Sequence, residues 1–417
     1  MSARDADVLI LGGGVIGLAC AHYLLAAGRT VEIVDQATVG AGASHGNCGT
    51  LTPSHAPPLA MPGMIGKALR MMFEADAPFH IKPRLDFALL HWMLRFAARC
   101  NWTDFRRAIP VRAGLLMRSR ELIEALVAAE RLDCGFEALG TLSVYRDAAS
   151  LERMQPSLER LREVGMPFDL MDGAAACRLE PALDEHIAGA IHYPRDAHLR
   201  PGRFVVELAR RVRERGGTIR EGERVSDFRT DGDRVTAVIT GVAERRAREI
   251  VLALGAWSPV LGCEIGIQIP VQPGKGYSIT YERPAVCPRI PLTLKERSVC
   301  VTAWADGYRL GSTMEFAGYD SSLNRHRLDA LVRGASEYLI EAEGPRRVEE
   351  WYGWRPMTWD DLPIIGRAPR YANLTLATGH GMLGVTLSAI TGLLVSEIVC
   401  GRPPSVDPTP YLPSRFA

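Results

Sequence analysis

Near the N-terminus, a strand, a glycine-rich turn, a helix and a second strand follow one another within one short segment. Residues 8–11 form a continuous apolar run, and a GxGxxG turn follows at once. Residues 18–27 have the pattern of a helix that ends at Gly28, and residues 31–34 form a second apolar strand closed by Asp35. This order predicts a β-α-β unit at the start of a buried parallel sheet.

The three glycines of this turn have separate physical functions. Gly12 allows the tight turn, Gly14 lets the backbone approach a pyrophosphate, and Gly17 lets the helix pack closely on the strand. The helix N-terminus offers unpaired N–H groups to phosphates. Asp35 lies where a carboxylate can accept the hydroxyls of an adenosine ribose. Together these residues predict a dinucleotide-binding unit rather than a glycine-rich turn without a ligand.

The segment after Asp35 discriminates between the two common dinucleotide cofactors. Residues 39–49 are a second loop rich in small residues. A nicotinamide enzyme would normally continue with another crossover helix, whereas a longer flavin cofactor needs backbone beside its ribityl chain and ring. The loop therefore favours FAD over NAD, and over the alternative of a flexible surface loop.

Further pieces of the same unit occur far along the chain. Residues 204–215 have the pattern of an amphipathic helix, residues 225–240 that of a hairpin, and residues 249–255 that of an apolar strand running into Gly255. We therefore expect an α/β protein with an α+β substrate part, in which an FAD-binding Rossmann-like domain is interleaved with a mixed-sheet substrate domain. The expected FAD-binding segments are 1–56, 196–262 and 351–417, and the expected substrate segments are 57–195 and 263–350.

Residues 57–130 are expected to be mostly helical, and residues 58–112 carry nine Lys/Arg against four Asp/Glu. A basic amphipathic segment can lie on an anionic membrane surface. The alternative, which we favour, is that it packs on the substrate domain. No stretch reaches the length of a spanning helix. We expect a cytoplasmic protein, and peripheral attachment to the inner face of the cell membrane or to a partner subunit stays open.

Charge and cysteine content exclude other classes of protein. The formal net charge is +1, which argues against a nucleic-acid binder. The nine cysteines form no CxxC pair, so neither a disulfide framework nor a metal site is indicated, and a reducing compartment fits best.

Two features near the C-terminus point to a reaction site. Residues 374–378 read as a strand, followed by Gly379, His380 and Gly381 and an apolar helix to residue 398, which is an anion-binding arrangement beside a reduced flavin. His380 is a candidate catalytic residue. An interpretation at least as good is that it is a loop residue that contacts the cofactor through its backbone. Arg355 lies among aromatic residues and suits a substrate carboxylate, although a surface ion pair is the commoner fate of an arginine.

The chain resembles the D-amino-acid dehydrogenase family, within the D-amino-acid oxidase/glycine oxidase flavoprotein superfamily, and is similar to its D-hydroxyproline dehydrogenase branch. The resemblance covers nearly the whole chain. Its motifs are the N-terminal fingerprint and residues 46–49, 56–63, 180–181, 273–278, 355–358, 363–366 and 379–381.

The resemblance implies non-covalent FAD and assigns site residues. Arg355 would hold the substrate carboxylate, with Tyr277 and His380 as the other candidate catalytic residues. The candidate cofactor-binding residues are Gly12, Gly14, Val15, Ile16, Gly17, Asp35, Gln36, Ser44, His45, Asn47, Cys48, Gly49, Leu51, Val225, Gly255, Trp257, Gly381, Met382, Leu383 and Gly384. Of these, residues 47–49 would face the flavin ring, residues 381–384 its pyrimidine edge, and Val225 the adenine. Cys48 and Trp359 depart from the family pattern, and Trp359 is expected to reshape the mouth of the pocket.

The implied activity is oxidation of a D-amino or D-imino acid by hydride transfer to flavin N5, with electrons passed to quinone or another carrier. D-alanine, D-proline and cis-4-hydroxy-D-proline are the favoured substrates. Three alternatives stay open: an FAD subunit of a heteromeric D-hydroxyproline dehydrogenase, an oxygen-using D-amino-acid or glycine-type oxidase, and an FAD-binding tRNA-modifying or structural protein. The near-neutral charge and Arg355 count against the last of these.

Overall fold

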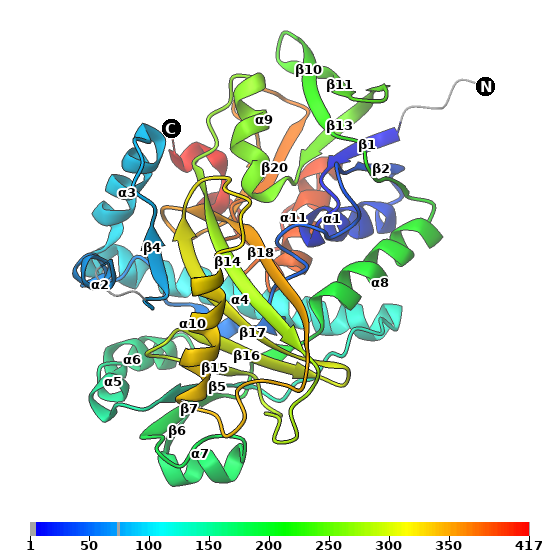
Figure 1. The fold of residues 1–417 in the computed structure, drawn as a ribbon. Helices are drawn as coiled ribbons and strands as arrows, with labels where there is room; N and C mark the ends of the chain where they lie inside the picture. Colours follow the sequence, from blue (N-terminus) through cyan, green and yellow to red (C-terminus); the bar gives the residue numbers. More distant parts are fainter. Residues whose placement is uncertain (1–5, 73–75, 417) are drawn as a thin grey trace.

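The computed structural model describes residues 6–72 and 76–416. Its first sheet has six strands in the order β19-β20-β13-β1-β2-β9 (Figure 1). The strands are β1 (Ala6–Leu11), β2 (Val31–Val34), β9 (Thr218–Arg220), β13 (Ala247–Leu252), β19 (Ile364–Arg367) and β20 (Leu374–Thr378). All pair in parallel except β19, which is antiparallel to β20. The predicted parallel sheet, assembled from distant segments, is confirmed.

Alternate residues of β1 show why this sheet is covered on both faces. Val8 and Ile10 pack in one apolar cluster with helices α1 (Val15–Ala26), α8 (Pro201–Glu214) and α11 (Ser388–Cys400). Leu9 and Leu11 pack in another, which includes the hairpin strands β10 (Val225–Asp231) and β11 (Arg234–Thr240). Because successive side chains of a strand point to opposite faces, a strand buried on both sides is apolar throughout.

The second sheet has nine strands, in the order β18-β14-β17-β16-β15-β5-β7-β6, with β4 also paired to β17. Its strands are β4 (Phe79–Ile81), β5 (Thr141–Tyr145), β6 (Asp169–Asp172), β7 (Gly189–Tyr193), β14 (Val271–Tyr281), β15 (Leu292–Leu294), β16 (Val299–Trp304), β17 (Gly307–Phe316) and β18 (Arg347–Thr358). It is a mixed sheet, as predicted. The boundary expected between residues 350 and 351 falls inside β18, which pairs with β14 over its whole length, so the segment up to Thr358 lies in this second sheet.

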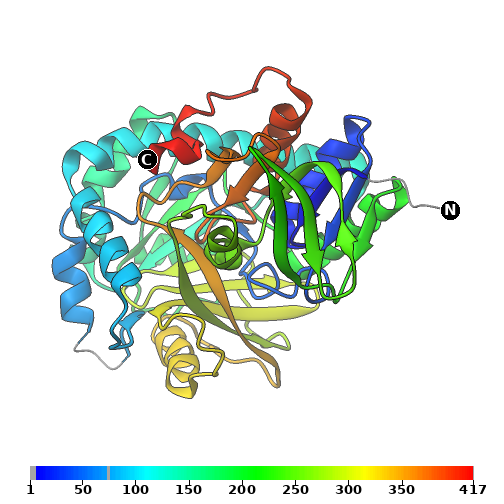
Figure 2. The same cartoon turned by 90° about the horizontal axis from the view of Figure 1, so that it is seen from above.

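The segment 57–130 is largely helical, as predicted, and contains α2 (Met64–Met71), α3 (Phe87–Arg99) and α4 (Trp102–Glu130). Figures 1 and 2 place α2 and α3 on one side of the molecule, away from the six-stranded sheet. Leu89 and Trp92 of α3 pack against Phe316 and Met357, so one face of this helix is buried on the second sheet. No helix within the described residues is both long and apolar enough to span a membrane.

The remaining elements are short and lie around the two sheets. The helices are α5 (Ala148–Glu152), α6 (Gln155–Glu163), α7 (Gly173–Leu179), α9 (Ser258–Glu264) and α10 (Arg325–Ser336), with 3₁₀ turns η1 (Pro53–His55), η2 (Gly255–Trp257), η3 (Thr409–Tyr411) and η4 (Pro413–Phe416). The small strands are β3 (Thr50–Leu51), β8 (Ala197–His198) and β12 (Glu244–Arg245).

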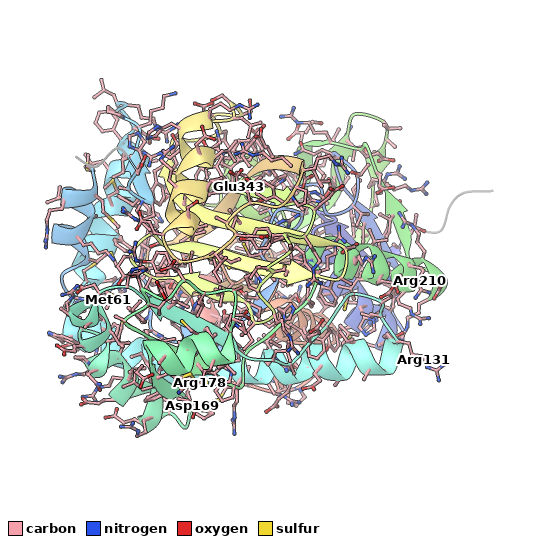
Figure 3. The ribbon with its side chains drawn as sticks, turned by 60° about the horizontal axis from the view of Figure 1, so that its bottom comes forward. Met61, Arg131, Asp169, Arg178, Arg210 and Glu343 are labelled. Atoms are coloured by element: carbon pink, nitrogen blue, oxygen red, sulfur yellow. The ribbon has the colours of Figure 1, made fainter. Side chains whose placement is uncertain are left out.

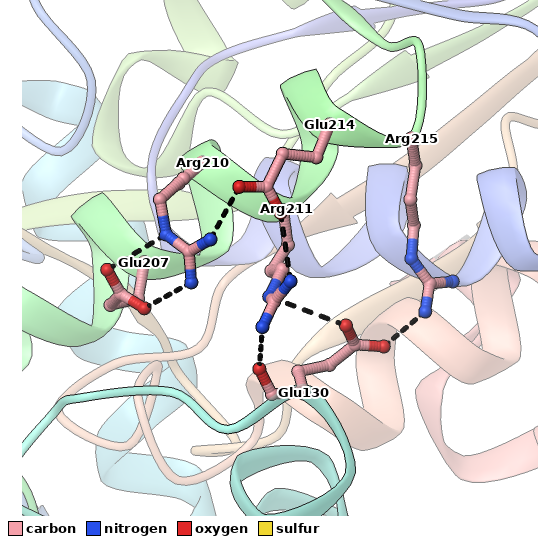
Figure 4. A network of polar contacts seen from close by, with 6 residues as sticks. All are labelled: Glu130, Glu207, Arg210, Arg211, Glu214 and Arg215. Carbon is pink, nitrogen blue, oxygen red and sulfur yellow. Dashed lines mark hydrogen bonds and ion pairs between the residues drawn. The ribbon is translucent and has the colours of Figure 1, made fainter.

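The C-terminal end of α4 is tied to α8 by charged side chains. Figure 3 shows Arg131 at this end of α4, where its φ of 50° ends the helix in the left-handed region. Just before it, Glu130 pairs with Arg211 and Arg215 of the α8 end (Figure 4). Arg210 pairs with Glu207 and Glu214 along α8 itself. The Glu130 side chain that joins the two helices is only 12% exposed, so these ion pairs fix how α4 and α8 meet.

Candidate functional site

A cavity of about 1120 Å³ is lined by residues of both sheets. Its walls come from the β1–α1 turn, the end of β2, the segment 40–58, η2, strands β15 to β18 and the segment 377–385. A cavity of this size, reaching from the glycine turn to the second sheet, can hold an extended dinucleotide together with a small substrate.

The glycine turn has the geometry that a close ligand approach needs. Gly12 has a φ of 110°, and a Cβ there would lie 2.5 Å from the carbonyl oxygen of Ala253. A Cβ on Gly17 would overlap the carbonyl oxygen of Gly12, so the helix packs directly on the turn. The first turn of α1 carries no acidic side chain. Its N-terminus is therefore free to face an anion.

Asp35 ends β2 beside this turn. Its carboxylate accepts hydrogen bonds from the N–H groups of Gly13, at 2.6 Å, and Ala37, at 2.8 Å. Burial raises the pKa of Asp35, and these two hydrogen bonds oppose that shift. Each oxygen keeps further acceptor capacity toward the cavity, which suits the two hydroxyls of a ribose.

The small-residue loop is held between the two sheets by an arginine that sequence reasoning missed. Arg309 of β17 donates to the carbonyl oxygens of His45 and Asn47, both at 2.8 Å. The side chain of Asn47 accepts from the N–H of Gly49 at 2.6 Å. At the other end of the loop, Ser44 accepts from the N–H of Val15 at 3.1 Å. The loop thus runs from the helix N-terminus to the second sheet along the cavity.

The segment after β20 forms the opposite wall. Gly379 has a φ of 74° and Gly381 a φ of 54°, and the N–H of Gly381 donates to the carbonyl oxygen of Pro356 at 2.9 Å. This hydrogen bond joins the segment to the residue beside Arg355. The helix expected directly after Gly384 begins only at Ser388, because residues 381–387 form turns, so the N-terminus of α11 is set back from the glycines.

His380 is buried in this wall, and Nε2 lies 3.0 Å from the hydroxyl oxygen of Thr391. The hydroxyl donates its own hydrogen to the carbonyl oxygen of Leu387, so Nε2 is the donor and His380 is the neutral tautomer protonated there. Burial lowers the pKa of His380 to about 3. The side chain stays neutral at working pH, which favours a structural contact over acid–base catalysis.

Arg355 of β18 reaches across the second sheet into the cavity. Its guanidinium lies over Gly276 of β14, where a Cβ would overlap it. Nη1 donates to the carbonyl oxygen of Thr313 at 2.6 Å, and Nη2 points to that of Ser312 at 3.4 Å. It forms no ion pair with any carboxylate among residues 6–72 and 76–416. Burial lowers its pKa, so an incoming carboxylate would supply the missing counter-charge.

The carbonyl groups that hold Arg355 come from strained backbone. Ser312 has a φ of 126° and Thr313 a φ of 60°, both unusual for residues with a side chain. The register of β14 against β17 shifts at this point. Such irregularities re-aim backbone and side chains and concentrate at functional sites. Here the irregularity turns two carbonyl oxygens toward one guanidinium.

Aromatic rings form the wall next to Arg355. Trp257 stacks on Tyr319 with ring centres 4.5 Å apart, and Trp354 lies edge-on to Trp257 at 5.4 Å. Trp359 is not part of this wall, which corrects the expectation that it reshapes the pocket mouth. It lies in the turn after β18, with its ring against those of His91 and Phe416.

The structure brings most of the predicted site residues to this one cavity. Those that line it are Gly12, Gly14, Val15, Ile16, Asp35, Gln36, Ser44, Asn47, Cys48, Val225, Gly255, Trp257, Arg355, His380, Gly381, Met382, Leu383 and Gly384. Gly17, His45, Gly49 and Leu51 are neighbours that do not line it.

Tyr277 is the one candidate catalytic residue that lies outside the cavity. Its ring is fully buried in the core of the second sheet, and its hydroxyl donates to Glu315 at 2.6 Å. Burial raises the pKa of Tyr277. The alternation along β14 explains the placement, because Gly276 faces the guanidinium of Arg355 and the next side chain points to the other face of the sheet.

A buried ion pair forms part of the cavity wall, and sequence reasoning missed it as well. Arg112 of α4 pairs with Asp361 at 2.9 Å and donates to the carbonyl oxygens of His55, at 3.0 Å, and Ala56, at 2.8 Å. Asp361 also accepts from the N–H of Leu59 at 3.1 Å. The available signal was the pair of adjacent acids 360–361 in a chain segment otherwise apolar.

The geometry fits FAD. The glycine cradle and helix N-terminus suit the pyrophosphate, Asp35 suits the ribose, and residues of the loop 40–48 and of the segment 380–384 line the same cavity, where they would contact the ring.

Comparisons with known proteins agree with this geometry. The family model described as FAD dependent oxidoreductase matches residues 7–398. The D-amino acid dehydrogenase of Granulibacter bethesdensis is 33% identical, covering 98% of this chain and 99% of its own length. That of Allorhizobium ampelinum is 34% identical, covering 98% of both. Among solved structures, glycine oxidase from Geobacillus kaustophilus matches with a TM-score of 0.81 at 24% identity, covering 98% of each chain.

Proposed function

The chain belongs to the family of FAD-dependent oxidoreductases, and on that premise we propose that it oxidises D-amino or D-imino acids. FAD is its cofactor. The curated relatives that match along the full length are named D-amino acid dehydrogenase, which supports this class of substrate. D-alanine, D-proline and cis-4-hydroxy-D-proline are the substrates that the sequence resemblance implies, with the imine or 2-oxo acid as product.

The observation that carries the proposal is the uncompensated guanidinium of Arg355 at the end of the cavity. A substrate α-carboxylate would bind it bidentately, in a site whose aromatic wall excludes water. The backbone carbonyl groups of Ser312 and Thr313 fix the guanidinium from behind, so that its free edge faces the ligand. Bound FAD supplies the acceptor for the α-hydrogen as hydride.

No acidic or basic side chain is needed to remove a proton from carbon. His380 and His55 line the cavity, and burial lowers the pKa of each to about 3, so both stay neutral. The substrate amine enters as the free base, and the protein contributes orientation, charge recognition and exclusion of water.

The experiment is anaerobic mixing of the holoenzyme with matched D- and L-amino acids, D-proline, cis-4-hydroxy-D-proline, glycine and sarcosine, while flavin absorbance is followed. Bleaching by D-compounds and none by their L-enantiomers is the expected result. Bleaching by L-compounds alone, or by none of the panel with FAD bound, would contradict the proposal. Dye reduction without oxygen, against peroxide formation in air, then separates a dehydrogenase from an oxidase.

The electron acceptor that we propose is quinone or another carrier met at a membrane. The outer sides of α2 and α3 expose a set of large apolar side chains, which we call the docking face: Ile65, Leu69, Met72, Leu85, Phe87, Leu90 and Leu94. Phe87 is 85% exposed and Leu85 is fully exposed. Residues 65, 69 and 72, and residues 87, 90 and 94, each follow a helical stripe.

Basic side chains surround the docking face. Lys67, Arg70, Arg95 and Arg99 are exposed on the same two helices. An apolar surface with a basic surround is complementary to an anionic bilayer. We therefore propose peripheral attachment through this face, on the inner side of the cell membrane.

Sedimentation with lipid vesicles tests the docking face. The holoenzyme should co-sediment with vesicles that contain anionic phospholipid, and the variant Phe87→Ser/Leu94→Ser should remain in solution. Val242→Ser, which removes an equally exposed apolar side chain elsewhere, is the control. No co-sedimentation of the unaltered protein at low salt would contradict membrane attachment and leave this face to a partner subunit.

A further inference from the structure

A second cation, Lys295, faces the cavity without a partner among the residues that the structure describes. Lys295 follows β15 directly, and its backbone N–H donates to the carbonyl oxygen of Val144 at 3.0 Å. Its side chain lines the cavity and makes no hydrogen bond or ion pair with any residue in the described ranges. Burial lowers the pKa of Lys295, so the protein offers this ammonium little compensation of its own. An unpaired charge that is removed from water raises the free energy of the folded state unless a ligand supplies a counter-charge.

Strand register places Lys295 on the same wall as Arg355. The guanidinium of Arg355 reaches Ser312 on β17. Ser312 pairs with Val299 on β16, Val299 pairs with Leu294 on β15, and Lys295 is the next residue. Ser312 and Lys295 are therefore about two strand spacings apart, roughly 10 Å between their backbones. Arg355 and Lys295 both line the cavity.

Lys295 lies in the turn that follows β15 and lines the cavity. Polar residues of three neighbouring strands line it as well: Thr293 of β15, Cys300 of β16 and Ser312 of β17. The wall between the two cations is therefore polar and uncharged.

Within residues 6–72 and 76–416, no free carboxylate on the cavity wall balances these cations. The four acidic lining residues in these ranges are all engaged elsewhere: Asp35 with backbone N–H groups, Glu223 with Arg245, Glu350 with Arg325, and Asp361 with Arg112. Lys67 of α2 adds a further positive charge at the exposed rim. The part of the cavity beyond Arg355 thus carries excess positive charge.

We propose that Lys295 binds a second carboxylate of the substrate, which makes acidic D-amino acids such as D-glutamate and D-aspartate the preferred class. The α-carboxylate lies on Arg355 and the distal carboxylate on Lys295. The inference rests on the proposed function, since it names the substrate class of the same site. A monocarboxylic substrate would leave the ammonium of Lys295 without a counter-charge.

The test compares D-glutamate with D-glutamine, which has nearly the same shape and no distal charge. The ratio of kcat/KM for D-glutamate over D-glutamine should be at least tenfold in favour of the acid for the unaltered holoenzyme. Lys295→Met keeps the length of the side chain and removes its charge, so the ratio should fall at least tenfold. Lys82→Met, which removes a lysine that pairs with Asp320 outside the cavity, should leave the ratio unchanged.

Two results would overturn the inference. The unaltered enzyme could favour the amide, or Lys295→Met could slow both substrates equally and leave the ratio unchanged, as a merely structural residue or a general base would.

A binding measurement keeps the inference testable if no D-amino acid reduces the flavin and the proposed function fails. Glutarate and butyrate differ by one carboxylate, and their binding can be followed by the flavin absorbance spectrum. Glutarate should bind at least tenfold more tightly than butyrate, and Lys295→Met should abolish the difference. Equal binding of the two acids would overturn the second carboxylate site irrespective of the reaction.

Discussion

Two histidines in the cavity wall are poor candidates for proton transfer, and His380 shows why. Its Nε2–H is committed to Thr391, and burial holds its pKa at about 3. In the unfolded chain the same imidazole takes a proton below about pH 6.5. The unfolded state therefore binds more protons between about pH 6.5 and pH 3, and the free energy of unfolding falls as the pH falls through this window.

This linkage gives a prediction at the residue scale. Lowering the pH from 6.5 to 5 should cost the unaltered protein about 2 kcal/mol of stability that the variant His380→Gln does not lose. Denaturant unfolding of both holoenzymes at the two pH values measures the difference. A difference between the two proteins that is the same at both pH values would show that the pKa of His380 is not lowered in the folded state, which would contradict the prediction.

Single residues also show which parts of the site could be predicted from the sequence and which could not. Arg355 could be singled out because an arginine among aromatic residues is unusual. Arg309, Lys295 and the pair Arg112–Asp361 could not, because each acts on segments far away in the chain. Tyr277 was assigned to the site from its motif, although the strand alternation turns it into the core.

At the scale of single elements, β14 positions the site because it has no side chain at Gly276. Gly276 leaves room above the strand, and the guanidinium of Arg355 occupies that room on its way to β17. The strand needs glycine here for close approach of another side chain rather than for a turn.

Gly276→Ala should therefore displace the guanidinium of Arg355 and leave FAD in place. The expected result is a rise of at least tenfold in KM for the D-amino acid, with the bound flavin content unchanged. Gly114→Ala on α4 is the control, since a Cβ there has nothing within 4 Å. An unchanged KM for Gly276→Ala would mean that the position of Arg355 does not depend on this space.

Regular elements were predictable where the local pattern is strong. The strand at residues 31–34 and the hairpin between 225 and 240 agree with β2, β10 and β11. The start of α11 was predicted too early, because an apolar run does not show that its first residues form turns. The irregular pairing at Ser312 and Thr313 has no local signal, since it arises where β14 and β17 lose register.

At the scale of the whole molecule, the two sheets could be predicted from the sequence, but the contacts between them could not. The discontinuous six-stranded sheet followed from apolar strands that recur beside glycines, and the long segments between its pieces implied a second domain. The cavity requires contacts between the loop 40–49, β17 and the segment after β20, which only the folded chain brings together. The domain boundary near residue 351 was misplaced for the same reason, because β18 belongs to the second sheet by its pairing.

The proposed function depends most directly on Arg355, which should bind the carboxylate of a substrate that reduces the flavin. The most direct measurement is the rate of anaerobic flavin reduction as a function of D-amino acid concentration, for the unaltered holoenzyme and for Arg355→Met. Loss of a buried charge pair costs about 2–5 kcal/mol, so half-saturation should require a concentration at least about 30 times higher in the variant. Bound FAD should be equal in both proteins. Equal half-saturation in the two proteins would contradict the account.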